Sequence, residues 1–175
     1  MGRFFWIYFA FMLAVLIPMN IVCFQQGPNR QGPGQSTERQ PGAILGSIEE
    51  SHEAYVNDPP TFGPHVGELA NYGFHETTIP DEIQVANLEA GFVIVHFNPA
   101  GGVQLEVEMR QLAAEFESYN VVVHPDADLG ETQVALTAWG RFELQESYDK
   151  DEIYAFILNW VREDRLSLPE PTPNR

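Results

Sequence analysis

Residues 85–97 read VANLEAGFVIVHF, and the end of this stretch decides the fold. From residue 92 to residue 97 the side chains are apolar on both alternating faces, with His96 as the polar exception. Such a segment is typical of a central strand that is covered on both sides. The residues before it, which carry the single acid Glu89, favour a turn. The sequence therefore predicts an α/β domain built around this strand.

An amphipathic helix is predicted after the central strand. Residues 98–102 read NPAGG and break the strand. Further on, apolar residues recur at steps of four, three and four, with acids on the opposite face. This stripe consists of Leu105, Met109, Leu112 and Phe116. Residues 121–123, which are three valines, then predict a second short buried strand.

A hairpin and a second helix complete the predicted domain. Residues 134–138 and 141–144 flank Trp139-Gly140, which predicts a β-hairpin. Asp149, with Glu152 three residues later, resembles a capping box and predicts the start of a helix. The order β-α-β-β-β-α predicts a mixed sheet of about four to five strands with two main helices. This order is analogous to the second half of a thioredoxin-like sheet, an analogy that does not give a function. The stripe of the second helix is Ile153, Phe156, Ile157, Trp160 and Val161.

The first 24 residues predict one transmembrane helix that acts as an uncleaved signal anchor. Residues 4–24 carry no charge, and their length matches the roughly 20 apolar residues that span a bilayer core. A cleaved signal peptide and a lipid-modified Cys23 are the alternatives. A signal peptide normally has a shorter apolar core of about 7–15 residues and a small-residue cleavage site, which is missing here. The anchor includes Phe4, Trp6, Phe11, Leu16 and Phe24.

Composition divides the rest of the chain into three parts. Residues 25–43 are rich in Gly, Pro and Gln and predict a linker or an extended strap. Residues 44–166 form the predicted α/β domain, and residues 167–175 form a Pro-rich tail. Because almost everything that can fold follows the anchor, the simplest topology is a single pass with the N-terminus inside and the domain outside the membrane.

The chain is strongly acidic. It holds 25 acidic and 9 basic residues, a net charge of −16, and only Glu38 among the acids precedes residue 44. A surface of this kind repels phosphate groups, so a nucleic-acid function is excluded. The charge serves solubility or the docking of a basic partner. The one cysteine, Cys23, lies in the predicted anchor, so the domain has no disulfide, thiol nucleophile or cysteine metal ligand.

The histidines form no recognised metal or catalytic motif. Zinc sites on helices typically use paired histidines four residues apart, and this spacing is absent. His96 alternates with apolar strand residues and is predicted to be a histidine of the core or its rim. The loop after His124 is acidic, but it lacks the twelve-residue calcium-loop spacing, so a polar turn is predicted. No nucleophile elbow, phosphate loop or dinucleotide fingerprint is present.

One proline-rich loop is more specific. Residues 58–65 read DPPTFGPH and hold three prolines, a glycine and His65. Together with Tyr55, Gly73, NLEAG at 87–91 and LTAWGR at 136–141, this loop resembles the bacterial family known as domain of unknown function 3105. The likeness covers roughly residues 52–161. The resemblance implies a membrane-anchored extracytoplasmic protein with no assigned reaction.

The resemblance also implies a metal site that has degenerated in this chain. The family pattern is typically His-Asn-Leu-Glu-His-Gly, with Ser-Gly-x-His ending the proline loop and a histidine upstream. The two motif histidines fall on Ala86 and Ala90, and the loop serine falls on Phe62. Alanine has no lone pair for a metal ion, so no bound cofactor is expected. The remaining candidate ligands for zinc or copper are His52, His65 and Glu89.

Two functions are consistent with these patterns. The leading hypothesis is a non-enzymatic accessory subunit of a larger membrane complex, photosynthetic or respiratory, on the extracytoplasmic side. Its partners would be other subunits of that complex, including a basic extracytoplasmic one. The alternative is a metal-binding protein or metal-dependent enzyme that uses His52, His65 and Glu89.

Overall fold

The computed structural model describes residues 32–161. The predicted anchor at 4–24 and the predicted tail at 167–175 lie outside these residues. Between residues 32 and 161, no helix is long and apolar enough to cross a membrane.

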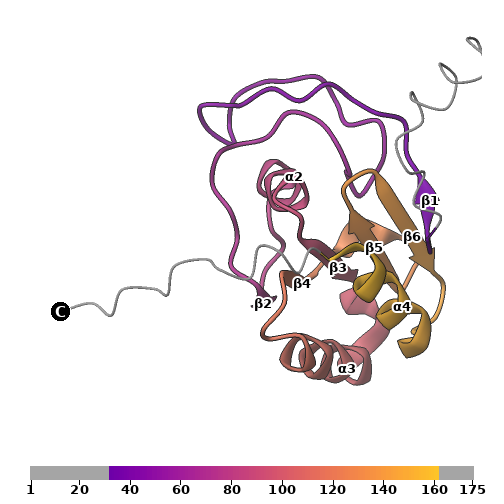
Figure 1. Cartoon of the computed structure of the whole chain (residues 1–175). Helices are drawn as coiled ribbons and strands as arrows, with labels where there is room; N and C mark the ends of the chain where they lie inside the picture. The colour runs from indigo at the N-terminus through magenta and orange to yellow at the C-terminus, as the bar shows by residue number, and fades with distance from the viewer. Residues whose placement is uncertain (1–31, 162–175) are drawn as a thin grey trace, which may run out of the picture. The chain divides into compact units, whose positions relative to one another are not determined.

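A six-stranded mixed sheet forms the centre of the fold, in the order β1-β6-β5-β3-β4-β2 (Figure 1). β3 and β2 run parallel to β4, whereas β5, β6 and β1 continue the sheet antiparallel on the other side. The predicted α/β class with a mixed sheet is confirmed. The strands are β1 (Gln35–Ser36), β2 (Gly73–Phe74), β3 (Val93–Phe97), β4 (Val121–Pro125), β5 (Val134–Ala138) and β6 (Arg141–Gln145).

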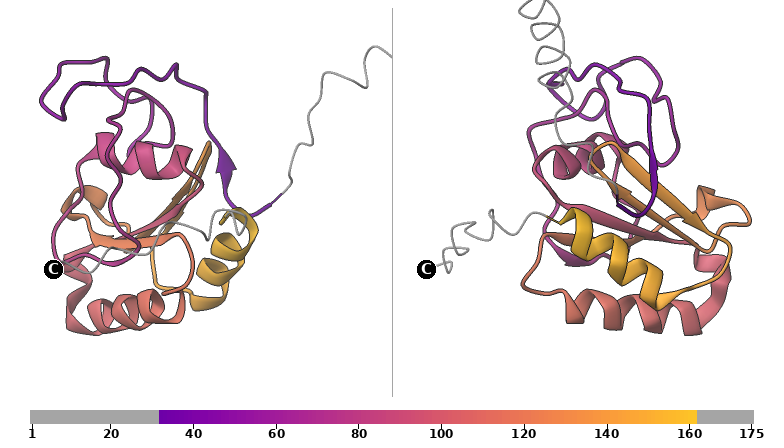
Figure 2. Two further views of the ribbon diagram at one scale, coloured as in Figure 1. Left: turned by 60° about the vertical axis from the view of Figure 1, so that its left-hand side comes forward. Right: turned by 45° about the vertical axis from the view of Figure 1, so that its right-hand side comes forward.

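Two predicted helices cover one face of the sheet. α3 (Gly102–Glu115) and α4 (Lys150–Trp160) lie together on this face, opposite α2 (Asp81–Glu89), as Figure 2 shows. The side chain of Asp149 caps α4 by accepting hydrogen bonds from the amides of Asp151 and Glu152. The predicted stripes are buried except for Trp160, which is half-buried. Met109 and Leu112 of α3 and Ile153 and Phe156 of α4 lie in one core cluster with Val93, Val95 and Phe97 of β3.

The third helix, α2, occupies most of the stretch before the central strand that was predicted to be a turn, so that prediction was wrong there. Residues 85–89 are helical, and only Ala90 and Gly91 form the turn. The sequence hid this helix because its buried residues include the polar Gln84 and Asn87. The Asn87 amide exchanges two hydrogen bonds of 2.9 Å with the backbone of Ala70. Gly91, at φ +92°, supplies the left-handed residue that commonly ends a helix.

The folded region also begins earlier than residue 44. β1 pairs with β6 through Gln35 and Ser36, inside the stretch predicted to be a linker. The indole N–H of Trp160 donates a hydrogen bond of 2.9 Å to the carbonyl of Pro33. A segment without apolar side chains can hold this place because its backbone supplies the contacts. Residues 32–37 therefore form a strap along the edge of the sheet.

Candidate functional site

One side of α2 carries two histidine–glutamate pairs. Glu82, Ala86 and Glu89 are spaced four and three residues apart, so their side chains share one side of the helix. The Nε2 atom of His52 lies 3.1 Å from Oε1 of Glu82. The Nε2 atom of His65 lies 2.9 Å from Oε2 of Glu89. Ala86 therefore stands between two pairs along the helix.

The proline loop fixes the ring of His65. The histidine is buried, and its Nδ1–H donates to the carbonyl of Gly63 at 3.0 Å. Two backbone hydrogen bonds also hold this residue. The N–H of His65 donates to the Ala43 carbonyl, and the N–H of Leu45 donates to the His65 carbonyl. The Tyr55 hydroxyl donates to the Pro64 carbonyl at 2.7 Å and closes the loop from the other side. The Nε2 atom is thereby aimed at Glu89.

His52 is fixed in a similar way but belongs to the other pair. Its Nδ1–H donates to the Glu53 carbonyl at 2.7 Å, and its ring lies 5.1 Å from that of Tyr55. Hydrogen bonding to Glu82, and then to the Glu53 carbonyl, raises the pKa of His52. In each pair both ring nitrogens face oxygen acceptors. The acceptors beside each ring can be met by one proton on each ring nitrogen. A cation beside Nε2 can take the place of the proton there.

A groove of about 430 Å³ opens beside the second pair. Ile44 and Leu69 form apolar rims and are 71% and 39% exposed. We call this feature the α2 groove. Its lining consists of Ile44, His65, Val66, Gly67, Leu69, Ala86, Glu89 and Ala90.

The structure brings together two of the three predicted metal ligands. His65 and Glu89 are in contact, whereas His52 contacts Glu82 instead. Among residues 32–161, no group of three or more His, Cys, Asp or Glu side chains could hold a metal ion. Ala86 and Ala90 line the same groove as His65, so imidazoles at these positions would lie on the wall beside it.

A second polar cluster, which the sequence did not predict, lies inside the domain. His96 and His124 are paired in register on the parallel strands β3 and β4, with their rings 4.6 Å apart. The Nε2 atom of His96 is 3.0 Å from the Thr137 hydroxyl, and its Nδ1 atom is 3.4 Å from Oδ2 of Asp126. Burial lowers the pKa of His96, and it lowers the pKa of His124 to about 3. The prediction of a core histidine at position 96 is confirmed.

The remaining parts of the proline loop have packing roles. The ring of Phe62 packs edge-on against Trp139, with the centroids 4.7 Å apart. Gly140 has a φ of +73°, and a side chain there would meet the Phe62 ring. The aromatic ring at position 62 therefore fastens the loop to the β5–β6 hairpin.

These observations define an acidic α/β domain with an open groove beside a short helix. The chain belongs to the family described as protein of unknown function (DUF3105), whose model matches residues 48–175. This match confirms the resemblance drawn from the sequence. No curated protein and no solved structure shows significant similarity to the chain.

Proposed function

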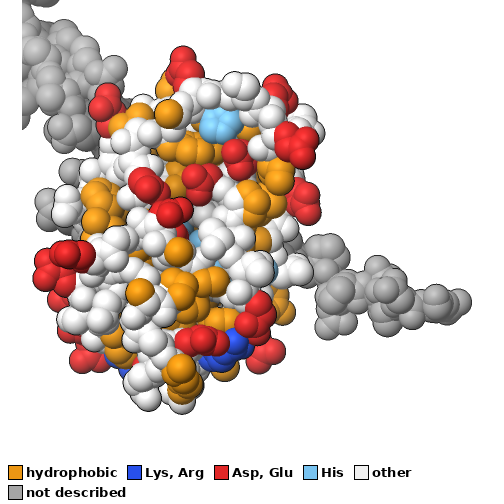
Figure 3. All heavy atoms as spheres, turned by 180° about the vertical axis from the view of Figure 1, so that it is seen from behind, with side chains coloured by type: hydrophobic (Ala, Val, Ile, Leu, Met, Phe, Trp, Pro, Cys, Tyr) orange, Lys and Arg blue, Asp and Glu red, His pale blue; other side chains and the backbone are white. Residues whose placement is uncertain are grey.

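We propose that the protein is a non-enzymatic accessory subunit of a larger membrane complex, photosynthetic or respiratory. The observation that carries the proposal is the surface around the α2 groove. Exposed Ile44, Ile48, Val56 and Leu69 lie in the segment that also contains Glu49, Glu50, Glu53 and Glu68. Figure 3 shows hydrophobic side chains among acidic ones across this upper part of the domain. Exposed apolar surface that is bordered by charged side chains is typical of protein interaction sites.

The apolar N-terminal stretch supports a membrane location for the subunit. Residues 4–24 would hold the chain in the bacterial inner membrane, with the domain on the periplasmic side. The proposal also treats the central sheet as thioredoxin-like, because β4-β3-β5-β6 are neighbours and α3 and α4 cover the same face. In this setting the sheet is a scaffold that presents the groove.

The charge of the domain favours a basic partner. Arg110 and Lys150 already pair with glutamates of the domain itself, and Arg141 stacks on Trp160. A net charge of −16 would steer a positively charged partner towards the domain. The association should therefore weaken as salt is raised, because exposed charges are screened beyond about 8 Å at physiological ionic strength.

The test is native purification of the tagged full chain from membranes, with identification and quantification of what travels with it. Leu69→Asp and Ile44→Asp place a charge on the groove rim and should reduce the amount of partner several-fold. Leu158→Asp is the matched control, because Leu158 is an exposed apolar residue of α4. A chain that purifies alone, or three variants with equal effects, would reject the groove as the contact.

A metal-binding function, with zinc or copper, is the second candidate. Metal-bound histidines usually donate the second ring N–H to a carbonyl or carboxylate, and His52 and His65 both donate Nδ1–H to a backbone carbonyl. Metal analysis of the natively purified chain tests this function. Stoichiometric metal that His65→Ala releases would establish it in place of the accessory role, either as a metalloprotein or as a metal-dependent enzyme.

A further inference from the structure

Among residues 32–161, no strand pairs with the outer edge of β2. β2 pairs with β4 through Gly73 and Phe74, and the sheet order ends at β2. The amide of His75 donates to Val123 at 2.8 Å, on the β4 side. Because successive backbone groups of a strand point in opposite directions, those of Phe74 point towards the open edge. Such an edge is a template for another strand.

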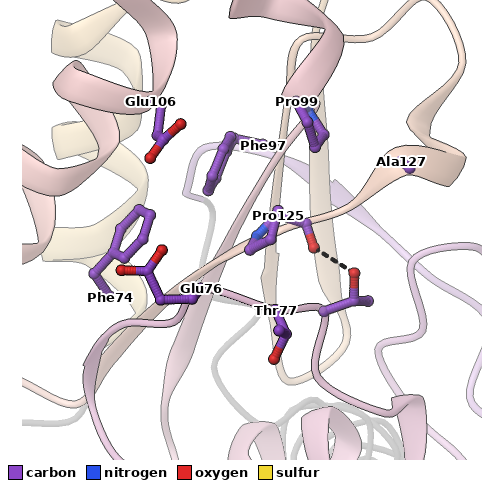
Figure 4. Close-up of a pocket in the computed structure, with 9 residues that line it drawn as sticks. Phe74, Glu76, Thr77, Phe97, Pro99, Glu106, Pro125 and Ala127 are labelled. Atoms are coloured by element: carbon purple, nitrogen blue, oxygen red, sulfur yellow. Dashed lines mark hydrogen bonds between the residues drawn. The ribbon is translucent and has the colours of Figure 1, made fainter. Parts of the chain in front are cut away.

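Phe74 lines two grooves beside this strand. The first has a volume of about 440 Å³ and lies where β3 and β4 end. Figure 4 shows Phe74, Phe97 and Pro125 around this groove, with Glu76 and Glu106 on the side of Phe74. The second has a volume of about 410 Å³, and its walls include Tyr72, Ala113, Ala114 and Glu117. The two grooves can therefore receive side chains from two alternate positions of an added strand.

The charge of the grooves favours a basic occupant. The guanidinium of Arg110 lies 4.0 Å from the centre of the Phe74 ring. It donates two hydrogen bonds to Glu76, at 3.0 and 2.8 Å, and two to Glu106, at 3.1 and 2.7 Å. With Glu117, three carboxylates therefore line the grooves beside one guanidinium. Small basic areas bordered by acidic side chains are visible along the lower part of Figure 3.

We propose that the β2 edge and its two grooves dock an extended, basic segment of a partner protein. The segment adds a strand beside Phe74, and its alternate side chains, which point to the same face of the sheet, enter the two grooves. Backbone hydrogen bonds hold the segment, while Glu76, Glu106 and Glu117 select positive charge. The inference rests on the proposed accessory function and adds a contact separate from the α2 groove.

A capped nonapeptide of alternating arginine and valine is the probe, measured by fluorescence anisotropy against the full chain in mild detergent. The matched control is the same peptide with N-methyl groups on every second residue, which removes backbone donors but keeps the charge. Each backbone hydrogen bond contributes about five-fold to affinity, so the control, which cannot donate to the Phe74 carbonyl, should bind about five-fold more weakly. Equal binding of the two peptides, or no binding of either, would overturn the proposal.

Charge variants of α3 test whether the peptide binds at the two grooves. Glu106→Gln removes a groove carboxylate, and Ala114→Arg adds a positive charge to the second groove. Each should weaken binding by about two- to five-fold, the usual range for one exposed ion pair. Glu108→Gln and Gln111→Arg make the same charge changes on the same helix outside both grooves. Controls that weaken binding as much as the groove variants would reject the site.

Two further results separate this inference from the proposed function. Peptide binding by a chain that purifies from membranes without a partner would reject the accessory role and support the edge site. Concentration-dependent dimerisation that Glu106→Gln strengthens would assign the edge to a second copy and overturn the proposal. Far-UV circular dichroism confirms that each variant is folded before binding is measured.

Discussion

His65 joins two segments that are distant in sequence, because its Nε2 atom lies 2.9 Å from Oε2 of Glu89. The two partners contribute unequally to this contact. The side chain of His65 is 5% exposed, whereas that of Glu89 is 54% exposed. The proline loop therefore depends on the histidine much more than on the acid.

This asymmetry predicts different costs for the two substitutions. Glu89→Gln removes the charge of the exposed partner and should change the free energy of unfolding by less than about 1 kcal/mol. His65→Ala leaves the Gly63 carbonyl without its donor and opens a gap, so it should cost about 1–3 kcal/mol. Chemical denaturation followed by fluorescence measures both. Equal losses would show that the ion pair, and not the packing of the ring, holds the loop.

Restoring imidazoles to α2 should create a metal site. We expect the unmodified chain to keep its melting temperature in a chelator. Ala86→His with Ala90→His adds two donors to the groove that holds His65 and Glu89, and structural zinc sites use four. Zinc or copper should then raise the melting temperature, because binding to the folded state alone stabilises it. The same double variant with His65→Ala is the control and should respond much less.

Asp81 is predicted to destabilise the domain at neutral pH. Burial, and then Asp58, raises the pKa of Asp81 to about 6 from an ordinary value of 3.8. The protonated carboxyl is favoured on folding, so its contribution is complete below about pH 4 and is lost as the pH rises through 6. Asp81→Asn should therefore stabilise the chain by about 1–2 kcal/mol at pH 7, after allowance for solvent screening and the helix dipole.

That gain should fade towards pH 4, which is the specific signature of the buried carboxyl. Asp151→Asn is the matched control, because Asp151 lies in the first turn of α4 and is exposed. Unfolding free energies measured from pH 4 to pH 8 distinguish the two variants. A constant effect of Asp81→Asn across this range would contradict the assignment.

The sequence predicted the parts of the fold whose signal is local. The apolar run of β3 and the stripe of α3 needed only periodicity, and the Asp149 cap needed only residue spacing. α2 and β2 were missed because their signals are not local. Two residues, Gly73 and Phe74, become a strand only by pairing with β4.

The candidate site was only partly predicted, because some of its contacts have no local sequence signal. The family resemblance identified His65, through the proline loop, and Glu89, through the NLEAG motif. No sequence pattern connects His52 with Glu82, 30 positions away. The in-register stacking of His96 and His124 also depends on strand pairing. Each of these contacts exists only once the sheet and the loops have assembled.

His124 should make the domain sensitive to acid. Burial, and then the neighbouring His96, lowers the pKa of His124 to about 3. The ordinary pKa of histidine is 6.5. As the pH falls, this side chain is therefore protonated in the unfolded chain before the folded one, and stability is lost from pH 6.5 towards 3. The groups that act on its charge are His96, Asp126, His75 and the Pro125 carbonyl.

Each such proton contributes a slope of about 1.4 kcal/mol per pH unit. His124→Gln should therefore flatten the dependence of unfolding free energy on pH between 6 and 4, even if the variant is less stable at pH 7. His75→Gln is the control, because His75 is only partly buried and hydrogen-bonds to the Asn71 carbonyl. An unchanged slope for His124→Gln would assign the acid response to other groups.

The strap at residues 32–37 should contribute to stability through Trp160. The indole N–H donates to the Pro33 carbonyl at 2.9 Å, and Arg141 stacks over the same ring at 4.8 Å. Trp160→Phe removes this donor and should cost about 1 kcal/mol. Tyr154→Phe is the control on the same helix, because the buried Tyr154 hydroxyl has no hydrogen-bond partner among the described residues and its loss should be neutral or stabilising.

Protease sensitivity of the strap gives a second readout, since cleavage there should increase in Trp160→Phe alone. If both variants lose the same stability, or if the strap stays equally protected, the edge contact of β1 rather than Trp160 holds the strap in place.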